Sequence, residues 1–279
     1  MTEPLNAAAC LGSHDILFIT FDTLRFDVAA KAIELGETPN LASVLPSAQW
    51  ERRHTPSSFT FAAHQAFFAG FLPTPAEPRE RDGDAHHRLF AARFPGSVTT
   101  GRGTLVFDAP DIVSGFSAHG YRTICIGGTG FFNKRSPLGS VLPSLFDESW
   151  WDESLGVACR DSAANQVTRA IERIEAQPSD RRLFVFLNIA ACHPPHHFYR
   201  PADANDTADS QCAALADVDR HLPPLFDALQ KRAPVLAVLC SDHGTAFGED
   251  GYHGHRIGHP AVWDVPYAQT ILPRLGAPG

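Results

Sequence analysis

The sequence lacks a block of basic residues, a long apolar run and any pair of cysteines separated by two residues. Lys and Arg number 23 against 31 Asp and Glu, which gives a formal net charge of −8. A protein that binds nucleic acid usually presents a basic face, so nucleic acid is not an expected partner. The apolar runs are short and interrupted by polar residues, whereas a membrane-spanning helix needs about 20 apolar residues in succession. We therefore expect no membrane partner.

The beginning of the chain, MTEPLNAAACLGSHD, carries acidic residues and no basic segment, so a secretory signal peptide is not expected. Two of the six cysteines, Cys125 and Cys240, lie in apolar runs. Buried free thiols are typical of a reducing compartment, whereas a disulfide framework is typical of small secreted domains. The sequence therefore predicts a cytoplasmic protein.

What the sequence does contain is an alternation of two kinds of segment. Four short runs have the composition of strands buried on both faces: Asp15–Asp22, Tyr121–Gly128, Leu183–Ala190 and Val235–Asp242. Other segments have helical periodicity: Thr60–Phe71, Asp111–His119, Asp161–Ala176 and Asp209–Gln230, which Pro223 and Pro224 are expected to break. The alternation predicts an α/β fold, a three-layer sandwich around a mostly parallel central sheet.

Residues 1–279 are expected to form a single domain, because the chain has no internal repeat and no composition typical of a domain linker. The stretch Pro73–Pro95 is rich in Pro, Arg, Asp and His and is typical of a surface excursion. The segment WDVPYAQTILPRL is expected to add one last strand near the end of the chain.

Metal-binding side chains follow three of the predicted strands. Asp22 ends the first strand, and His193 follows the third. Asp242 and His243 end the fourth, with Gly244 permitting a turn. The carboxyl ends of parallel strands meet at one edge of the sheet, where ligands bind. One such Asp alone would be interpreted as a helix cap, but the set favours a metal site whose two carboxylates and imidazole suit Zn²⁺ or Mn²⁺.

Thr60 lies where a helix is expected to begin, because Ala63, Phe67 and Phe71 recur at helical spacing. A hydroxyl in this place is ordinarily an N-cap. It is also suited to be a nucleophile, since a helix N-terminus favours an anion and a neighbouring metal stabilises an alkoxide. The pattern leaves both interpretations open.

Five motifs carry a resemblance to a known family. In chain order they are FDTLRFD, TPNLASVLP, SSFTFAAHQAFFAGFLP, LADVDRHLPPLFDAL and SDHGTAFGEDGYHGH followed by WDVPY. Their order resembles the alkaline phosphatase superfamily, and most closely its sulfatases and phosphoethanolamine transferases. The chain is also similar to a small bacterial sulfatase-like family. The resemblance implies an alkaline-phosphatase-like fold over most of the chain, without the usual C-terminal subdomain of the sulfatases.

The resemblance also implies site residues. The metal ligands would be Asp22, Thr60, Asp242 and His243, with Thr60 as the nucleophile and with His193 and His255 contacting the phosphoryl group. These imply one divalent metal, Zn²⁺ or Mn²⁺, and leave room for a second, weaker site near His253, His255 and His259. His64 matches a family position, yet it could equally be a core histidine. Asp219 is expected to be structural, and Glu249 and Asp250 to order their loop.

The sequence departs from the sulfatases at the nucleophile. Sulfatases carry Cys or Ser in a C/S-x-P-x-R motif and convert that residue to formylglycine, but TPSSFTF contains neither that Cys nor the following Arg. Thr60 is not convertible by that route. A different frame would put Ser57 or Ser58 at the nucleophile, although the Phe-Thr-x-x-x-His spacing favours Thr60.

These observations predict an enzyme, a metal-dependent hydrolase of phosphoric esters or a phosphotransferase with a threonine nucleophile. The first alternative is a sulfuric ester hydrolase, and the second is a non-catalytic binding module on the same fold. The expected partner is a small-molecule phosphate or sulfate ester. Because the chain is short for the sulfatases, a partner subunit or a second copy of the chain could complete the site.

Overall fold

The computed structural model describes residues 5–70, 88–90, 104–106, 111–201 and 204–276. The predicted surface excursion at Pro73–Pro95 lies outside the described residues, apart from the short strand β3 (Arg88–Phe90), which pairs with β4 (Thr104–Val106). Within the described ranges, no helix has both the length and the apolar composition needed to cross a membrane.

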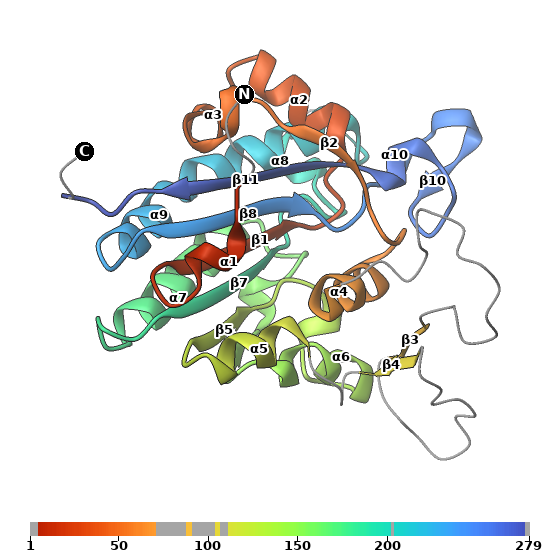
Figure 1. The fold of residues 1–279 in the computed structure, drawn as a ribbon. Helices are drawn as coiled ribbons and strands as arrows, with labels where there is room; N and C mark the ends of the chain where they lie inside the picture. Colours follow the sequence, from red (N-terminus) through yellow and green to blue (C-terminus); the bar gives the residue numbers. More distant parts are fainter. Residues whose placement is uncertain (1–4, 71–87, 91–103, 107–110, 202–203, 277–279) are drawn as a thin grey trace, which may run out of the picture.

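A seven-stranded sheet forms the middle of the molecule (Figure 1), in the order β2-β11-β8-β1-β7-β5-β6. The strands are β1 (Asp15–Phe21), β2 (Glu51–His54), β5 (Arg122–Ile126), β6 (Glu148–Trp150), β7 (Leu183–Ile189), β8 (Val235–Ser241) and β11 (Asp264–Leu272). The five strands from β8 to β6 are parallel, while β11 is antiparallel to β8 and β2 is antiparallel to β11. The mostly parallel sheet and the last strand, β11, are therefore confirmed.

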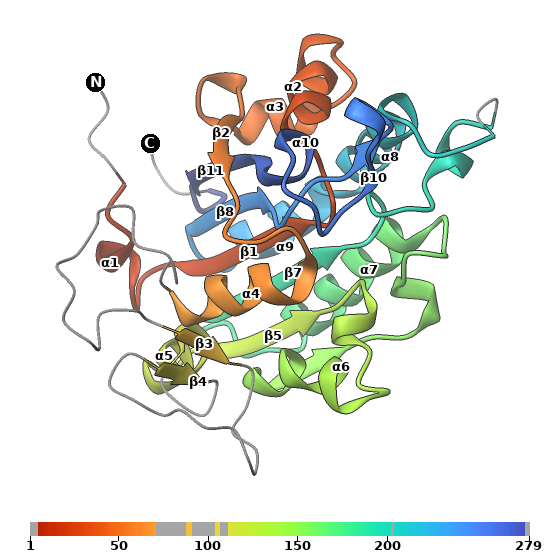
Figure 2. The ribbon, with the colours of Figure 1, turned by 90° about the vertical axis from the view of Figure 1, so that its right-hand side faces the viewer.

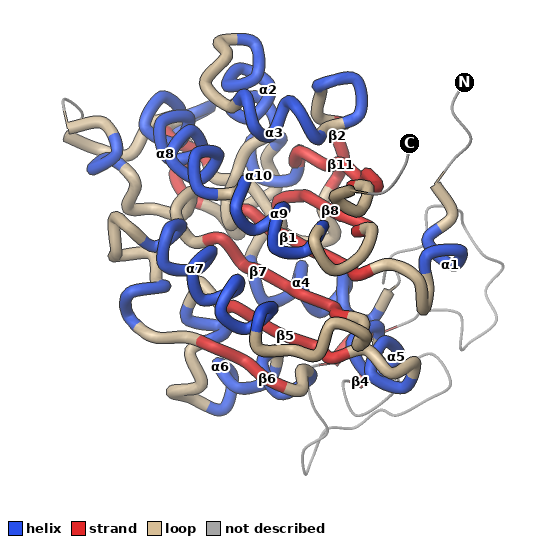
Figure 3. The backbone as a smooth tube through the Cα atoms, turned by 90° about the vertical axis from the view of Figure 1, so that its left-hand side faces the viewer, coloured by secondary structure: helices blue, strands red, loops and turns tan. Residues whose placement is uncertain are grey.

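Helices cover both faces of this sheet (Figures 2 and 3). On one face lie α2 (Phe26–Glu34), α3 (Pro39–Val44), α7 (Ser162–Glu175), α8 (Ala208–His221) and α9 (Pro223–Gln230). On the other lie α1 (Ala7–Cys10), α4 (Thr60–Ala69), α5 (Ile112–Ala118) and α6 (Pro137–Val141). The three-layer sandwich is thus confirmed, as is the break at Pro223, where α9 begins.

The local sequence explains where these helices begin and end. Thr207 and Ser210 form a capping box at the start of α8, and the Asp111 side chain caps α5. Helix α4 ends at Gly70, whose φ of 73° lies in the left-handed region that glycine adopts without strain. The predicted Thr60–Phe71 helix therefore begins at the predicted residue and ends two residues early.

The alternation of side chains along β1 divides the core into two parts. Leu17, Ile19 and Phe21 pack with the α2, α7 and α8 side, while Ile16 and Phe18 face the α4 side. The core on the α4 side is rich in aromatic rings. Phe186 of β7 lies at its centre, with ring centroids 5.1 to 5.8 Å from those of Phe18, Phe68, Phe132 and Phe146. These rings hold α4 against the middle of the sheet.

The register of the strands determines where the candidate site lies. Phe21, the last residue of β1, lies opposite Ile189 of β7 and Ser241 of β8. The residues that follow these three strands therefore emerge together at one edge of the sheet, as predicted.

The aromatic core generates a stability prediction. Phe186→Ala removes a fully buried ring and should lower the free energy of unfolding by about 3–5 kcal/mol, because it leaves a cavity among four other rings. Phe198→Ala, at a half-buried surface position, is the matched control and should cost about 1 kcal/mol or less. Urea unfolding of both variants measures the difference, and equal losses would contradict the prediction.

Candidate metal and active site

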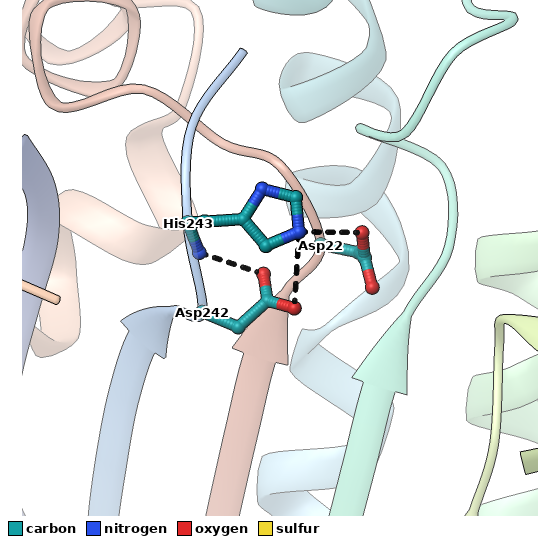
Figure 4. Close-up of side chains that lie close together, drawn as sticks. All are labelled: Asp22, Asp242 and His243. Carbon is teal, nitrogen blue, oxygen red and sulfur yellow. Dashed lines mark hydrogen bonds and ion pairs between the residues drawn. The ribbon is translucent and has the colours of Figure 1, made fainter. Parts of the chain in front are cut away.

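Asp22, Asp242 and His243 come together where β1 and β8 end (Figure 4). All three side chains are fully buried, and one ligand atom from each lies within 4.8 Å of the other two. His243 Nε2 is 3.9 Å from Asp22 Oδ1 and 3.7 Å from Asp242 Oδ2. The three atoms face a common point.

Hydrogen bonds occupy the remaining polar atoms of these side chains. Asp242 Oδ1 accepts from the N–H groups of Thr23 and His243, at 3.2 and 2.9 Å. His243 Nδ1 lies 2.8 Å from the carbonyl oxygen of Gly244, so it carries the proton and Nε2 keeps its lone pair. Asp22 Oδ2 accepts from the Asn188 amide at 3.0 Å. By contrast, Asp22 Oδ1 and Asp242 Oδ2 are buried without any hydrogen-bond partner.

Unpaired buried carboxylate oxygens are costly unless something charged faces them. Two such oxygens and one imidazole nitrogen with a free lone pair, at this separation, are the donor set of a Zn²⁺ or Mn²⁺ site. The residues present therefore fit the expected divalent metal.

The pKa shifts of Asp22, Asp242 and His243 are those expected of residues that can bind a divalent cation. Burial, and then the charge of Asp22, raise the pKa of Asp242 well above its usual value. Burial also opposes ionisation of Asp22, but the neighbouring His193 and His243 and the Asn188 hydrogen bond bring its pKa below the usual value. Burial lowers the pKa of His243, which keeps the ring neutral and able to bind a cation. A divalent cation would relieve the repulsion between the carboxylates.

Gly244 lets the chain turn just after these ligands. A Cβ atom at this position would lie 2.0 Å from the carbonyl oxygen of Ala261 in α10 (Pro260–Trp263), so no side chain fits. The Gly244 N–H donates to the Val262 carbonyl at 2.6 Å. The expected role of this glycine in shaping the turn is therefore supported by a close backbone approach.

Thr60 is the first residue of α4, and its hydroxyl faces the same group of atoms. Thr60 Oγ1 lies 3.3 Å from Asp22 Oδ2 and 3.3 Å from His243 Nε2, both of which are acceptors. The helix N-cap is Phe59, and no side chain caps the helix. Of the two interpretations that the sequence left open, the structure thus excludes an N-cap for Thr60.

His193 and His255 approach from two further segments. The ring centroid of His255 lies 4.7 Å from that of His243 and 5.9 Å from that of His193. His255 directly follows a small hairpin of β9 (Ala246–Phe247) and β10 (His253–Gly254), which returns the chain to the site. Burial, His243 and His193 lower the pKa of His255 to about 4. All six residues predicted from the sequence as metal ligands or catalytic groups are therefore brought to one place.

A comparison of the sequence with protein-family models shows which family this chain belongs to. The family model described as Sulfatase matches residues 14–268. The chain belongs to the sulfatase family. It is accordingly a member of the alkaline phosphatase superfamily, as the motifs implied.

Solved structures similar to this sulfatase-family chain agree on the fold. The soluble domain of lipooligosaccharide phosphoethanolamine transferase A from Neisseria meningitidis has a TM-score of 0.62 at 14% identity, covering 93% of this chain and 77% of that one. The C-terminal periplasmic domain of EcEptC from Escherichia coli, in complex with Zn, has a TM-score of 0.60 at 13% identity, covering 92% and 72%. A protein in the alkaline phosphatase superfamily from Vibrio parahaemolyticus has a TM-score of 0.54 at 14% identity, covering 94% and 60%. A search of the curated proteins found no match.

The histidines considered for a second metal site are placed differently from one another in this sulfatase-family fold. His253 is exposed, whereas His255 lies beside the first site. His259 Nδ1 accepts the N–H of Ala261 at the start of α10, and its Nε2 lies 3.2 Å from Asp250. Among the residues that the structure describes, the sole group of three potential ligands is Asp22, Asp242 and His243. The three histidines do not gather into a ligand set there.

Two of the carboxylates expected to be structural, Asp219 and Glu249, make contacts that join separate elements. Asp219 accepts the backbone N–H of Leu41 at 2.6 Å and thereby ties α8 to α3. Glu249 accepts the N–H of Phe247 at 2.6 Å and forms an ion pair with Arg25. Arg25, whose side chain is 8% exposed, follows closely after Asp22, so this ion pair joins the two loops that carry the metal-binding residues. Sequence reasoning missed Arg25, because nothing local shows which carboxylate it meets.

A second missed residue, His196, holds the loop that carries His193. Its side chain is fully buried, its Nδ1 lies 2.9 Å from Ser210 Oγ in α8, and its ring meets the edge of Phe247 at 5.5 Å. Burial lowers the pKa of His196 to about 4, and its Nε2 is buried without a partner. Protonation would thus leave a buried Nε2–H group without an acceptor, although Asp206 Oδ1 lies 3.6 Å from Nδ1.

Replacing one carboxylate should separate stability from metal binding. In the metal-free protein, Asp242→Asn removes the repulsion with Asp22 while its amide oxygen keeps both backbone hydrogen bonds, so the melting temperature should rise by a few degrees, equivalent to about 1 kcal/mol. The stabilisation that Zn²⁺ or Mn²⁺ gives the wild type should disappear. Thermal unfolding with and without metal measures both effects. Asp250→Asn, at an 82% exposed side chain, is the control and should change neither.

Acid should destabilise the protein partly through His196. An unfolded histidine has a pKa of about 6.5, whereas folding lowers the pKa of His196 to about 4. The unfolded state therefore binds the proton first, and stability is full above pH 6.5 and falls as the pH drops toward 4. His196→Asn, which can keep a donor near Ser210, should reduce this loss by roughly 2–3 kcal/mol between pH 7 and 4.5. Urea unfolding at both pH values checks this. An unchanged pH dependence would contradict it, and the exposed His119→Asn is the control.

Proposed function

We propose that this chain is a metal-dependent hydrolase of phosphoric esters with Thr60 as the nucleophile. The observation that carries the proposal is the position of the Thr60 hydroxyl, 3.3 Å from an oxygen of Asp22 and 3.3 Å from Nε2 of His243. A hydroxyl in this position can lose its proton next to two acceptors and beside the candidate metal site.

Asp22, Asp242, His243 and the Thr60 hydroxyl would hold one divalent cation, Zn²⁺ or Mn²⁺. When bound, such a cation acts as a Lewis acid that lowers the pKa of a nearby hydroxyl and polarises a phosphoryl oxygen. The solved Zn complex of EcEptC supports zinc as the first metal to test.

The chain's own residues would then carry out two displacements. Thr60 Oγ1 attacks phosphorus as its proton passes to Asp22 or His243, the bond to the leaving oxygen breaks, and His193 in its protonated form gives its proton to the leaving alcohol. Water, oriented by His255, then attacks phosphorus and gives a proton to His193, the bond to Thr60 breaks, and Thr60 takes back the proton held by Asp22 or His243. The unpaired N–H groups in the first turn of α4 favour the anionic phosphoryl group beside Thr60.

Hydrolysis of sulfuric esters is the first alternative, and family membership favours it. It would require a formylglycine, and the residue at the centre of this site is a threonine. Transfer of the phosphoryl group to an alcohol differs only in the acceptor that replaces water. A non-catalytic binding module, the second alternative, is disfavoured because it gives no reason for two unpaired carboxylate oxygens to face a histidine nitrogen.

The proposed substrate is a small-molecule ester, bound by residues 1–279 as one catalytic domain. The six cysteines are all free, in agreement with the cytoplasmic location proposed from the sequence. Light scattering of the purified protein measures whether the chain is a monomer, and a fully active monomer would show that no second copy contributes to the site.

Two substitutions at one position test the nucleophile. Thr60→Val keeps the shape and removes the hydroxyl, so kcat for p-nitrophenyl phosphate should fall at least about 1,000-fold, whereas Thr60→Ser should retain much of the activity. Ser57→Ala and Ser58→Ala are the controls for the other reading frame and should remain active. Full activity in Thr60→Val would refute the proposal. Turnover of p-nitrophenyl sulfate, together with a formylglycine detected by mass spectrometry in the peptide containing Thr60, would favour the sulfatase alternative.

A further inference from the structure

His64, in the second turn of α4, is a polar ring in an aromatic environment. Its side chain is fully buried, and the rings of Phe67, Phe68, Phe132 and Phe186 surround it with centroids 5.3 to 5.9 Å away. A buried imidazole in such a place needs partners for both ring nitrogens. Those partners lead directly to the candidate nucleophile.

Each nitrogen of His64 has one hydrogen-bond partner, and Nδ1 also lies 3.7 Å from Asp242 Oδ2. Nδ1 lies 2.7 Å from the carbonyl oxygen of Thr60, which can only accept, so Nδ1 carries the proton. Nε2 is then an acceptor, and the hydroxyl of Thr20 in β1 donates to it at 3.0 Å. The two contacts together fix the tautomer and the ring orientation.

The chain of hydrogen bonds continues through Asn188 of β7. Its Nδ2 group donates to Thr20 Oγ1 at 3.3 Å and to Asp22 Oδ2 at 3.0 Å. Its Oδ1 atom accepts the N–H of Thr129 at 3.1 Å, which sets the orientation of the amide. Asp22 Oδ2 also accepts from the Thr60 hydroxyl, so the chain returns to the residue from which it began.

We propose that His64 is a positioning residue, which closes a ring of hydrogen bonds through Thr20, Asn188 and Asp22 that fixes the Thr60 hydroxyl in the site. These five residues are called the Thr60 circuit below. The inference rests on the proposed function in one respect, namely that Thr60 acts on the substrate.

The circuit links the helix that carries Thr60 to the central sheet. Thr20 and Asn188 lie opposite each other on neighbouring strands, so one half of the circuit belongs to the rigid sheet. Thr60 and His64 belong to a helix in another layer, and no side chain caps the start of that helix. The bond between His64 and Thr20 gives α4 a second link to the strands, one turn along the helix from the contacts of the Thr60 hydroxyl with Asp22 and His243. A displacement of about 1 Å can cost 100-fold in rate.

The circuit also orients Asp22 toward the candidate metal site. Asn188 and Thr60 both occupy Oδ2, which leaves Oδ1 as the unpaired oxygen that faces His243 Nε2 and Asp242. Outer residues that orient metal ligands typically affect metal affinity or activity 10- to 100-fold. Breaking the circuit should therefore be detectable at the metal as well as in turnover.

Thr20→Val is the sharpest test, because valine has nearly the shape of threonine and lacks only the hydroxyl. In the metal-loaded enzyme, kcat for p-nitrophenyl phosphate should fall roughly 10- to 100-fold, with KM changed less than about threefold, since the fault lies in nucleophile position. Thr123→Val is the matched control. Thr123 is an equally buried strand threonine whose hydroxyl oxygen accepts the N–H of Asp147, away from the site.

A double variant distinguishes positioning from packing. His64→Asn retains a donor close to the Nδ1 position and removes the acceptor that Thr20 meets, so it breaks the same link as Thr20→Val. The double variant should then have a kcat no lower than that of the slower single variant, because the link can be broken only once. Multiplication of the two single losses would overturn the proposal.

The second readout does not depend on turnover. Co²⁺ titrated into the metal-free proteins gives a visible absorption spectrum that reports on the metal's surroundings. The spectrum of Thr20→Val should differ from that of the wild type in the same direction as the spectrum of Thr60→Val, while Thr123→Val should match the wild type.

The outcomes separate this inference from the proposed function. Unchanged kcat and an unchanged Co²⁺ spectrum in Thr20→Val, with only the melting temperature lowered, would overturn the positioning role and leave His64 as a core residue. Full activity in Thr60→Val would refute the proposed nucleophile instead, and the Co²⁺ spectra would still decide whether the circuit positions Thr60. If the wild type does not hydrolyse p-nitrophenyl phosphate, the spectra alone give the decision.

Discussion

The repulsion between Asp22 and Asp242 is the constraint around which the rest of this structure is arranged. Both carboxylates are fully buried at the ends of adjacent strands, and each keeps one oxygen without a hydrogen-bond partner. Removing charge from water without compensation is costly, so such a pair opposes folding by itself. A divalent cation held between the carboxylates and His243 would reverse the sign of that contribution. In a metal-binding protein, such an arrangement lowers the stability of the free protein and raises its affinity for the cation.

The remainder of the fold supplies the rigidity that holds these charges in place. Parallel pairing of β1 with β7 and β8 makes these strands end at the same level, so that Asp22 and Asp242 follow the sheet side by side. The aromatic core around Phe186 presses α4 onto the same strands. Arg25 and Glu249 then join the two loops beyond the strand ends. Each support acts from a different element, so the site does not depend on the flexibility of one loop.

The fold and the meeting of Asp22 with Asp242 could be predicted because their signals are local. A strand buried on both faces is visible as an apolar run, and Asp22 and Asp242 stand directly after such runs. The short strands β2 and β6 were not predicted, since Glu51–His54 is exposed and polar and Glu148–Trp150 is only three residues long. The partners of His64 were also beyond sequence reasoning. Thr20 meets His64 across 44 residues through helix packing, and Asn188 meets Thr20 across 168 residues through strand pairing, and no spacing along the chain encodes these contacts.

The choice of threonine at position 60 connects this geometry with chemistry. Oxidation of a threonine side chain at Cβ would give a ketone, because the methyl group remains, so the aldehyde of formylglycine is not accessible from Thr60. The same methyl group makes the side chain β-branched and restricts rotation about χ1. A hydroxyl that must point at Asp22 and His243 loses less freedom from such a side chain than from serine. The residue that removes the formylglycine route thus also favours a fixed alcohol nucleophile, and a fixed alcohol beside a metal is suited to phosphoryl transfer.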